Sequence, residues 1–169
     1  MGRSAFFLLL PLLVAAGCAT ATRPAGPVVP QSWTYPADAR ITQRGIMTAL
    51  GKQYTMNGFL FRSVSAGQRL VITENFGQIL ADVLVKPDGS VFVMRSSRAF
   101  KSKWIRRFVA ADLKGIFGSP QTPDPGIQLL SENHFAVRRR WYSLDLRILD
   151  VQAGPQPAAQ FDASQAEVP

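Results

Sequence analysis

The sequence predicts a mainly β (α+β) domain, in which a curved antiparallel sheet forms a half-barrel meander and one amphipathic helix crosses its concave face. Three observations predict it: repeated alternation of apolar and polar residues, short turn-like breaks, and one segment with helical periodicity. The 169 residues suffice for one domain with a real core. Side chains either fill the interior of such a sheet or leave an apolar hollow, and both outcomes stay open at this stage.

Several segments alternate apolar and polar residues with a period of two, as half-buried antiparallel strands do. They are Thr55–Val64, Gln68–Phe76, Gln78–Lys86, Ser90–Arg95 and Trp141–Val151. The breaks between the first four are short and contain glycine, which predicts hairpins. The clearest break spans residues 86–90, because proline presets its φ angle and an Asp-Gly pair tolerates positive φ.

One segment, Ser102–Phe117, has apolar residues at three- and four-residue steps, which predicts an amphipathic helix of about four turns. Ser102 is a candidate N-cap, and Gly118 ends the segment. Its apolar stripe needs a partner, and the apolar face of the sheet is the only large one available. After a proline-rich loop, Ile127–Ser131 is a candidate short edge strand, and His134–Arg140 begins the final strand pair.

The N-terminus has the pattern of an export signal. Arg3 is the only charge before an apolar run over Ala5–Val14, which is too short to span a bilayer. Small residues then precede Cys18, the only cysteine of the chain. This junction resembles the bacterial lipoprotein signal, which implies a signal peptide over residues 1–17 and a lipid anchor on Cys18. An ordinary secretory signal is the alternative.

Composition shifts divide the rest of the chain. Residues 18–36 hold the candidate anchor and four prolines, which predicts a stiff tether. Residues 37–153 form the predicted domain. Residues 154–169 have three prolines, four alanines and no basic residue, which predicts a disordered tail.

Scarce chemistry-bearing residues argue against several classes of site. The chain has one cysteine and one histidine, His134, so it has no disulfide framework. The same scarcity argues against a Cys/His zinc site and against a catalytic triad, in which His134 would be the only base. Asp82, Asp145 and Asp150 fall on outward strand positions, so no carboxylate pair converges for acid–base work. Asp112 is expected to pair with basic residues on its own helix. We therefore expect neither an enzyme nor a bound metal or cofactor.

The signal junction, the proline-rich tether, the meander and the crossing helix together resemble the LolA/LolB class of bacterial outer-membrane lipoprotein carriers and receptors. The stretch Gln68–Ser97 is the most similar: a strand, an apolar residue before glycine in a turn, a strand, a polar hairpin and a strand. Small lipoproteins of the same fold match equally well. The resemblance covers about residues 45–151, and its motifs are mostly structural, so fold likeness does not carry function by itself.

The resemblance implies a periplasm-facing lipoprotein of the outer membrane, because Ala19, and not aspartate, follows the anchor cysteine. It also implies that Phe76, at the turn before Gly77, corresponds to an apolar residue that enters the membrane in the receptors. Turn tips are commonly polar, so Phe76 either contacts lipid or folds back on the sheet.

Two groups of residues are candidate binding sites. Apolar residues expected to face the helix would contact acyl chains, or else simply form the core: Phe59, Phe61, Leu70, Ile72, Val83, Val85, Phe92, Met94, Phe108 and Leu113. A basic run is either a solvated face or a contact for anionic head groups or an acidic partner: Arg98, Lys101, Lys103, Arg106 and Arg107.

Two hypotheses of function follow. In the first, a monomeric lipoprotein binds acyl chains or lipid-anchored cargo in its concave face and helps to deliver or organise them at the membrane. In the second, a structural or adaptor lipoprotein with a filled core binds a periplasmic protein through its basic face. The net charge of +8 also suits nucleic acid, but an exported lipoprotein would not meet it, so we expect no nucleic-acid partner.

Overall fold

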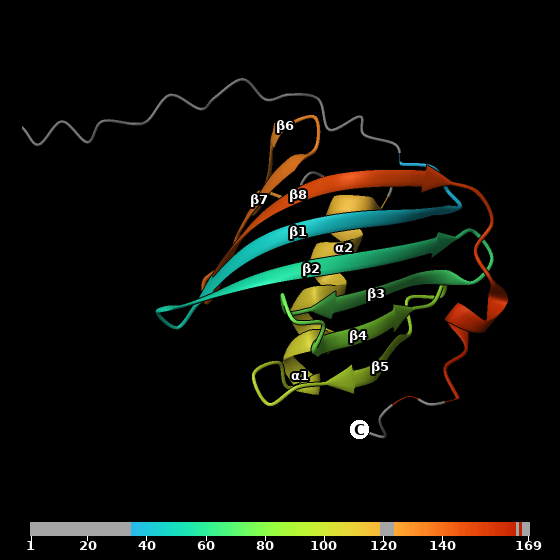
Figure 1. Cartoon of the computed structure of the whole chain (residues 1–169), viewed down its shortest axis with the longest axis horizontal. Coiled ribbons are helices and arrows are strands. Elements are labelled where there is room, and N and C mark those ends of the chain that lie inside the picture. The colour runs from blue at the N-terminus through green and yellow to red at the C-terminus, as the bar shows by residue number, and fades with distance from the viewer. Residues whose placement is uncertain (1–34, 119–123, 165, 167–169) are drawn as a thin grey trace, which may run out of the picture.

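The computed structural model describes residues 35–118, 124–164 and 166. They form one antiparallel sheet and one helix of three consecutive segments (Figure 1). The strands are β1 (Ala39–Ala49), β2 (Lys52–Ser63), β3 (Gly67–Thr73), β4 (Ile79–Val85), β5 (Val91–Ser96), β6 (Ile127–Ser131), β7 (His134–Arg138) and β8 (Tyr142–Ala153). The helical segments are α1 (Ser102–Trp104), η1 (Ile105–Val109) and α2 (Ala110–Phe117), followed late in the chain by the 3-10 turn η2 (Ala158–Phe161).

The sheet has the strand order β5-β4-β3-β2-β1-β8-β7-β6 and is open, with β5 and β6 at its edges. Strands β2 to β5 form the predicted meander of hairpins, and β1 precedes them as one more hairpin strand. The chain then crosses in the helix to the far edge, and β6 to β8 return toward β1. The predicted curved antiparallel sheet with one crossing helix is therefore confirmed. Strand β1 is absent from the predicted elements, although it is the strand that joins both halves of the sheet.

The helix lies across one face of the sheet, as its apolar stripe predicts (Figure 1). Ile105, Val109, Leu113, Ile116 and Phe117 from this stripe are all buried in the main core. The middle segment, Ile105–Val109, is a π-helix, a geometry with wider hydrogen-bonded turns that is frequent at functional sites.

The two ends of the helix were predicted with different success. Ser102 is not the N-cap: Lys101 holds that position, and the Ser102 hydroxyl lies 3.0 Å from that of Ser96 on β5. Gly118 does end the helix, where its amide donates to the Lys114 carbonyl at 2.8 Å.

Apolar side chains form two clusters, one on each face of the sheet. The main cluster lies between the sheet and the helix, and Leu60, Val83 and Val93 are fully buried in it. A smaller cluster lies on the opposite face, around Leu84 and Met94. Strand β4 is consequently buried on both faces, which blurs the alternation that predicts which side of a strand is inside.

The smaller cluster exists because the C-terminal segment packs on the sheet, which differs from the predicted disordered tail. Phe161, in η2, is only 3% exposed and packs with Leu84 and Met94. Arg69 and Lys86 donate hydrogen bonds to the backbone carbonyls of Gln160 and Phe161, at 2.9 and 2.8 Å. Buried apolar area and two charged donors thus order a segment whose composition suggests disorder.

Candidate functional site: an apolar cavity beneath the helix

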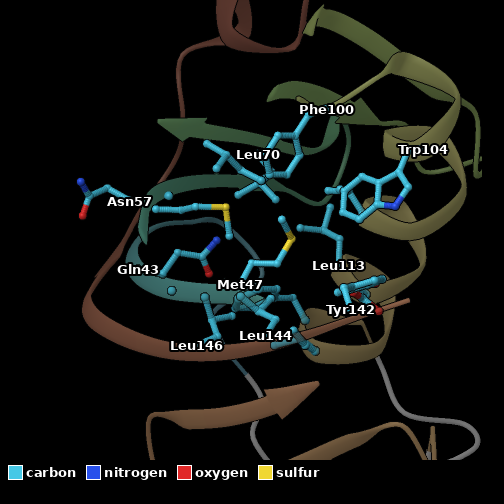
Figure 2. Close-up of a pocket in the computed structure, with 18 residues that line it drawn as sticks. Gln43, Met47, Asn57, Leu70, Phe100, Trp104, Leu113, Tyr142, Leu144 and Leu146 are labelled. Carbon is cyan, nitrogen blue, oxygen red and sulfur yellow. The ribbon is translucent and has the colours of Figure 1, made fainter. Parts of the chain in front are cut away.

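An apolar cavity of about 70 Å³ lies between the helix and the middle of the sheet. Figure 2 shows Met47, Leu70 and Leu113 directed toward one another from β1, β3 and the helix. The wall consists of these three residues with Gln43, Gly45, Met56, Asn57, Gly58, Ile72, Phe100, Trp104, Val109, Asp112, Ile116, Phe117, Tyr142, Leu144 and Leu146. Most of these side chains are apolar, so the cavity suits a ligand group that needs few hydrogen bonds.

Two glycines on the central strands form part of the cavity floor. Gly45 on β1 and Gly58 on β2 both line the cavity. The nearby wall residues of the same strands, Met47 and Met56, carry large side chains. Glycine weakens a strand interior and often marks a close approach of a ligand or another chain. Flexible side chains lie close to both glycines. A Cβ on Gly45 would lie 3.0 Å from Leu144 Cδ1, and a Cβ on Gly58 would lie 2.7 Å from Gln43 Cγ.

The volume sets a limit on what the cavity holds in this state. An engineered apolar cavity of about 150 Å³ accommodates benzene, and drug-sized ligands occupy about 300 Å³ or more. At about 70 Å³ the cavity is smaller than either. A long acyl chain therefore enters only if the helix moves outward and the flexible side chains over the floor turn aside.

An ionic cluster of Asp112, Asp124, Arg139 and Tyr142 ties the helix to the far half of the sheet. The Arg139 guanidinium donates to Asp112 Oδ1 at 2.6 and 3.0 Å, and to the Asp124 carboxylate at 2.7 and 2.8 Å. The Tyr142 hydroxyl donates to Asp112 Oδ2. The expected pairing of Asp112 within its own helix is therefore wrong, because its carboxylate points toward β8 and the turn before it.

Burial and charge shift the pKa values of this cluster in different directions. Burial raises the pKa of Asp112, against the opposing effect of hydrogen bonds from Tyr142 and Arg139. The hydrogen bond from Arg139 lowers the pKa of Asp124. Burial, and then the hydrogen bond to Asp112, raise the pKa of Tyr142. The cluster thus contains one buried carboxylate whose charge depends on Arg139.

The C-terminal end of the helix is held separately, by Arg62 of β2. Its guanidinium donates to the carbonyls of Tyr35, Pro36 and Phe117, each at 3.0 Å. Burial lowers the pKa of Arg62 and raises the pKa of Tyr35 to about 12. Arg62 accepts this partly buried position because backbone carbonyls of the helix end and of the chain entering β1 surround it.

The ten predicted acyl-contact residues divide into three groups. Leu70, Ile72 and Leu113 line the cavity. Val83 is buried in the main core, and Val85 and the helix residue Phe108 pack against that core, but none of the three lines the cavity. The remaining four, Phe59, Phe61, Phe92 and Met94, lie on the opposite face of the sheet, so their expected position beneath the helix is wrong.

These four residues were assigned to the wrong face of the sheet for a physical reason. On β2 the side that faces the helix carries Met56, Gly58 and Leu60, and the large aromatics point the other way. There Phe61, Phe92 and Met94 pack beside the C-terminal Phe161, while Phe59 stays 36% exposed. The prediction placed the side of β2 with the larger side chains beneath the helix. It is wrong because the C-terminal segment supplies a second apolar cluster on the other face.

Sequence reasoning missed the contribution of β1, which provides Gln43, Gly45 and Met47 to the cavity. In the structure, residues 39, 41, 43, 45 and 47 are buried and alternate with exposed or half-buried ones. A glutamine and a glycine among the five weaken the apolar alternation that would have marked a strand.

Phe76 occupies the tip of the β3–β4 turn and is 98% exposed. The turn is closed by a hydrogen bond from the Gly77 amide to the Glu74 carbonyl at 2.9 Å. The structure thus places Phe76 in solvent and not against the sheet, which removes the second of the two alternatives for this residue.

The predicted basic run covers the start of the helix and the loop before it. Arg98, Lys101, Lys103 and Arg107 are exposed, and Arg107 lies over the Phe108 ring at 5.4 Å. Arg106 is half-buried and donates to the Val91 carbonyl at 2.9 Å. The first four are free of ion pairs within the described part of the chain, so an external anion can reach them.

Carboxylates outside the ionic cluster make structural pairs. Asp82 lies on the face of the sheet away from the helix, as predicted, but it is 3% exposed and pairs with Arg69 at 2.7 Å, because the C-terminal segment covers that face. Asp145 lies 2.8 Å from His134 Nε2. Within residues 35–118 and 124–164, no three histidine, cysteine, aspartate or glutamate side chains gather closely enough to hold a metal ion.

Comparison with models of known protein families and with curated proteins gives no match for this chain. Among the described residues no helix is long and apolar enough to cross a membrane. Cys18, the predicted signal peptide and residues 18–34 of the predicted tether lie outside the described residues, whereas its last two residues, Tyr35 and Pro36, are held by Arg62.

Proposed function

We propose that this protein is a non-enzymatic outer-membrane lipoprotein that binds acyl chains, or the acyl groups of lipid-anchored cargo, between its helix and the concave face of its sheet. The observation that supports the proposal most is the apolar cavity beneath the helix, with two glycines in its floor. Neither glycine extends a side chain into the cavity, and the nearest atoms over them belong to the flexible side chains of Leu144 and Gln43.

Entry of a chain requires the cavity to widen, and several features favour that. The π-helical segment Ile105–Val109 lies directly over the sheet and has a less regular hydrogen-bond pattern than an α-helix. Met47 and Met56 in the wall are unbranched and adapt to different shapes. The small cavity is then the closed state, and ligand binding selects a state in which the helix stands further from the sheet.

Energetics constrain such a protein to passive transfer. Burying a chain of about 16 carbons contributes about 10 kcal/mol, at about 0.8 kcal/mol for each methylene group. The bilayer offers the chain the same burial, so the protein must bind it with comparable strength and release it to a tighter acceptor. An anchor on Cys18, exposed Phe76 and the basic residues near the helix start would hold the cavity close to the lipid that supplies the chain.

A second candidate function rests on the small volume of the cavity. If the interior never widens, the protein is an anchored adaptor that binds a periplasmic partner through its basic face. The exposed Arg98, Lys101, Lys103 and Arg107 support this alternative. The two functions differ in one measurable property, which is whether the interior accepts an acyl chain.

Titration of a fluorescent fatty-acid analogue tests the proposal. The chain from Ala19 onward contains every described element and lacks the apolar N-terminal run. We expect saturable binding of one analogue per molecule, displaced by dodecanoic acid. Met47→Trp fills the cavity centre and should abolish binding, with a loss of about 1–3 kcal/mol in the free energy of unfolding from overpacking.

The matched control is Phe59→Trp, which introduces tryptophan on the opposite, partly exposed face of the sheet. This variant should leave binding unchanged. No saturable binding by the unmodified protein would favour the adaptor function instead.

A further inference from the structure

One polar side chain in the cavity wall has no partner. Gln43 is 5% exposed, and its Oε1 atom is buried without a hydrogen-bond partner among the described residues. Its amide is directed into the space between β1 and the helix (Figure 2). A buried acceptor without a donor is costly, and leucine, a similar-sized apolar residue, would avoid that cost at this position.

The sheet is built to admit this glutamine. Gln43 lies directly opposite Gly58 in the pairing of β1 with β2. A Cβ on residue 58 would lie 2.7 Å from both Gln43 Cγ and Gln43 Nε2, so the glutamine occupies space that only glycine leaves free. The glycine and the buried amide therefore form a matched pair, which places one polar point in an otherwise apolar wall.

We propose that Gln43 recognises a hydroxyl group on the bound chain, so that the preferred ligand is a hydroxylated acyl chain. The inference rests on the proposed acyl-binding function and names the ligand class of the same site. A hydroxyl donates to Oε1 and accepts from Nε2, so it satisfies both ends of the amide at once. An unsubstituted chain leaves the Oε1 acceptor unpaired.

The charge of the wall argues against a carboxylate at this point. Asp112 is the one charged residue in the cavity wall, and it is an acid. A carboxylate buried near Gln43 would have no cation in the wall and would also lose its hydration. The acyl head group therefore stays outside, and the neutral hydroxyl is the group that reaches Gln43.

A competition experiment tests the inference. Dodecanoic, 3-hydroxydodecanoic and 12-hydroxydodecanoic acids compete with the fluorescent fatty-acid analogue on the chain from Ala19 onward. The two hydroxylated isomers carry the hydroxyl group near the carboxyl group and at the far end of the acyl chain, so both insertion depths are tested. We expect at least one of them to displace the analogue at about tenfold lower concentration than dodecanoic acid, as one buried hydrogen bond provides.

The variant Gln43→Leu should remove that preference while retaining binding of dodecanoic acid, and its unfolding midpoint should be equal or higher. Gln53→Leu is the control, since this glutamine is exposed at the start of β2. It should not change the displacing concentration of either hydroxylated acid relative to that of dodecanoic acid. An equal preference in the unmodified protein and in Gln43→Leu overturns the inference but leaves acyl binding intact. No binding by any of the three acids overturns both.

Discussion

Phe76 is the most exposed large apolar side chain of the described residues, and its surroundings explain why it costs the fold nothing. The β3–β4 turn is closed by backbone hydrogen bonds on either side of it, so the aromatic ring makes no contribution to the turn. Gly77, with φ of 81°, supplies the left-handed backbone that the turn needs. Removing the ring from water, for example at a lipid surface, would lower its free energy.

Replacing Phe76 with glutamate therefore separates membrane contact from folding. We expect Phe76→Glu to leave the free energy of unfolding within about 0.5 kcal/mol of the unmodified protein, because the ring is 98% exposed. Transfer of a fluorescent fatty acid to anionic lipid vesicles should slow severalfold. A clear fall in the unfolding midpoint would show that the ring packs on the sheet, and an unchanged transfer rate would show that the turn does not contact lipid.

At the scale of elements, the helix is held at three places that differ in chemistry. Its apolar stripe packs on the sheet, Arg62 binds the carbonyl of Phe117 at its C-terminal end, and the ionic cluster joins Asp112 to Arg139. Gly115 allows a further close approach, because a Cβ there would lie 2.4 Å from Ile127 Cδ1 of β6. Glycine weakens an isolated helix, but at this position it lets the Ile127 side chain of the edge strand pack directly against the helix.

The ionic cluster makes a sharp prediction about the position of the helix. Arg139→Gln leaves the buried Asp112 carboxylate without its cation, so we expect a loss of about 3 kcal/mol in the free energy of unfolding, measured with urea at pH 7. The neighbouring Arg140→Gln is the control: Arg140 is exposed, lies over the Trp141 ring, and should cost about 0.5 kcal/mol or less. Equal effects of the two substitutions would contradict the role given to the cluster.

Considering the whole molecule, the local patterns were sufficient for the architecture but not for the site. The helix over Ser102–Phe117 and the strand Ile127–Ser131 have the predicted bounds, because periodicity and nearby glycines and prolines define them locally. The large aromatic side of β2 faces away from the helix, where Phe61 packs beside Phe161, a hundred residues further along the chain. A contact at that separation leaves no trace in the alternation of a single strand.

The same limit applies to the cavity. Its floor includes Gly45 and Gly58 in adjacent strands, and Gln43 lies opposite Gly58 in the sheet register, where a Cβ on residue 58 would meet its side chain at 2.7 Å. Composition predicts an apolar interior in general terms, whereas strand register decides where that interior contains a gap and a polar atom. The cavity residues of β3 and the helix were predictable from periodicity, and those of β1 were not.

The central claim is that the helix moves outward to admit an acyl chain beneath it, and hydrogen–deuterium exchange tests this most directly. Exchange is followed in the helix, residues 102–117, and in the central strands of the chain from Ala19 onward, with and without saturating dodecanoic acid. We predict that the acid changes the exchange of the helix and of β1 and β2 at the cavity, and leaves the β6–β7 turn unchanged. Identical exchange with and without the acid, at a concentration that saturates the fluorescence titration, would contradict the claim.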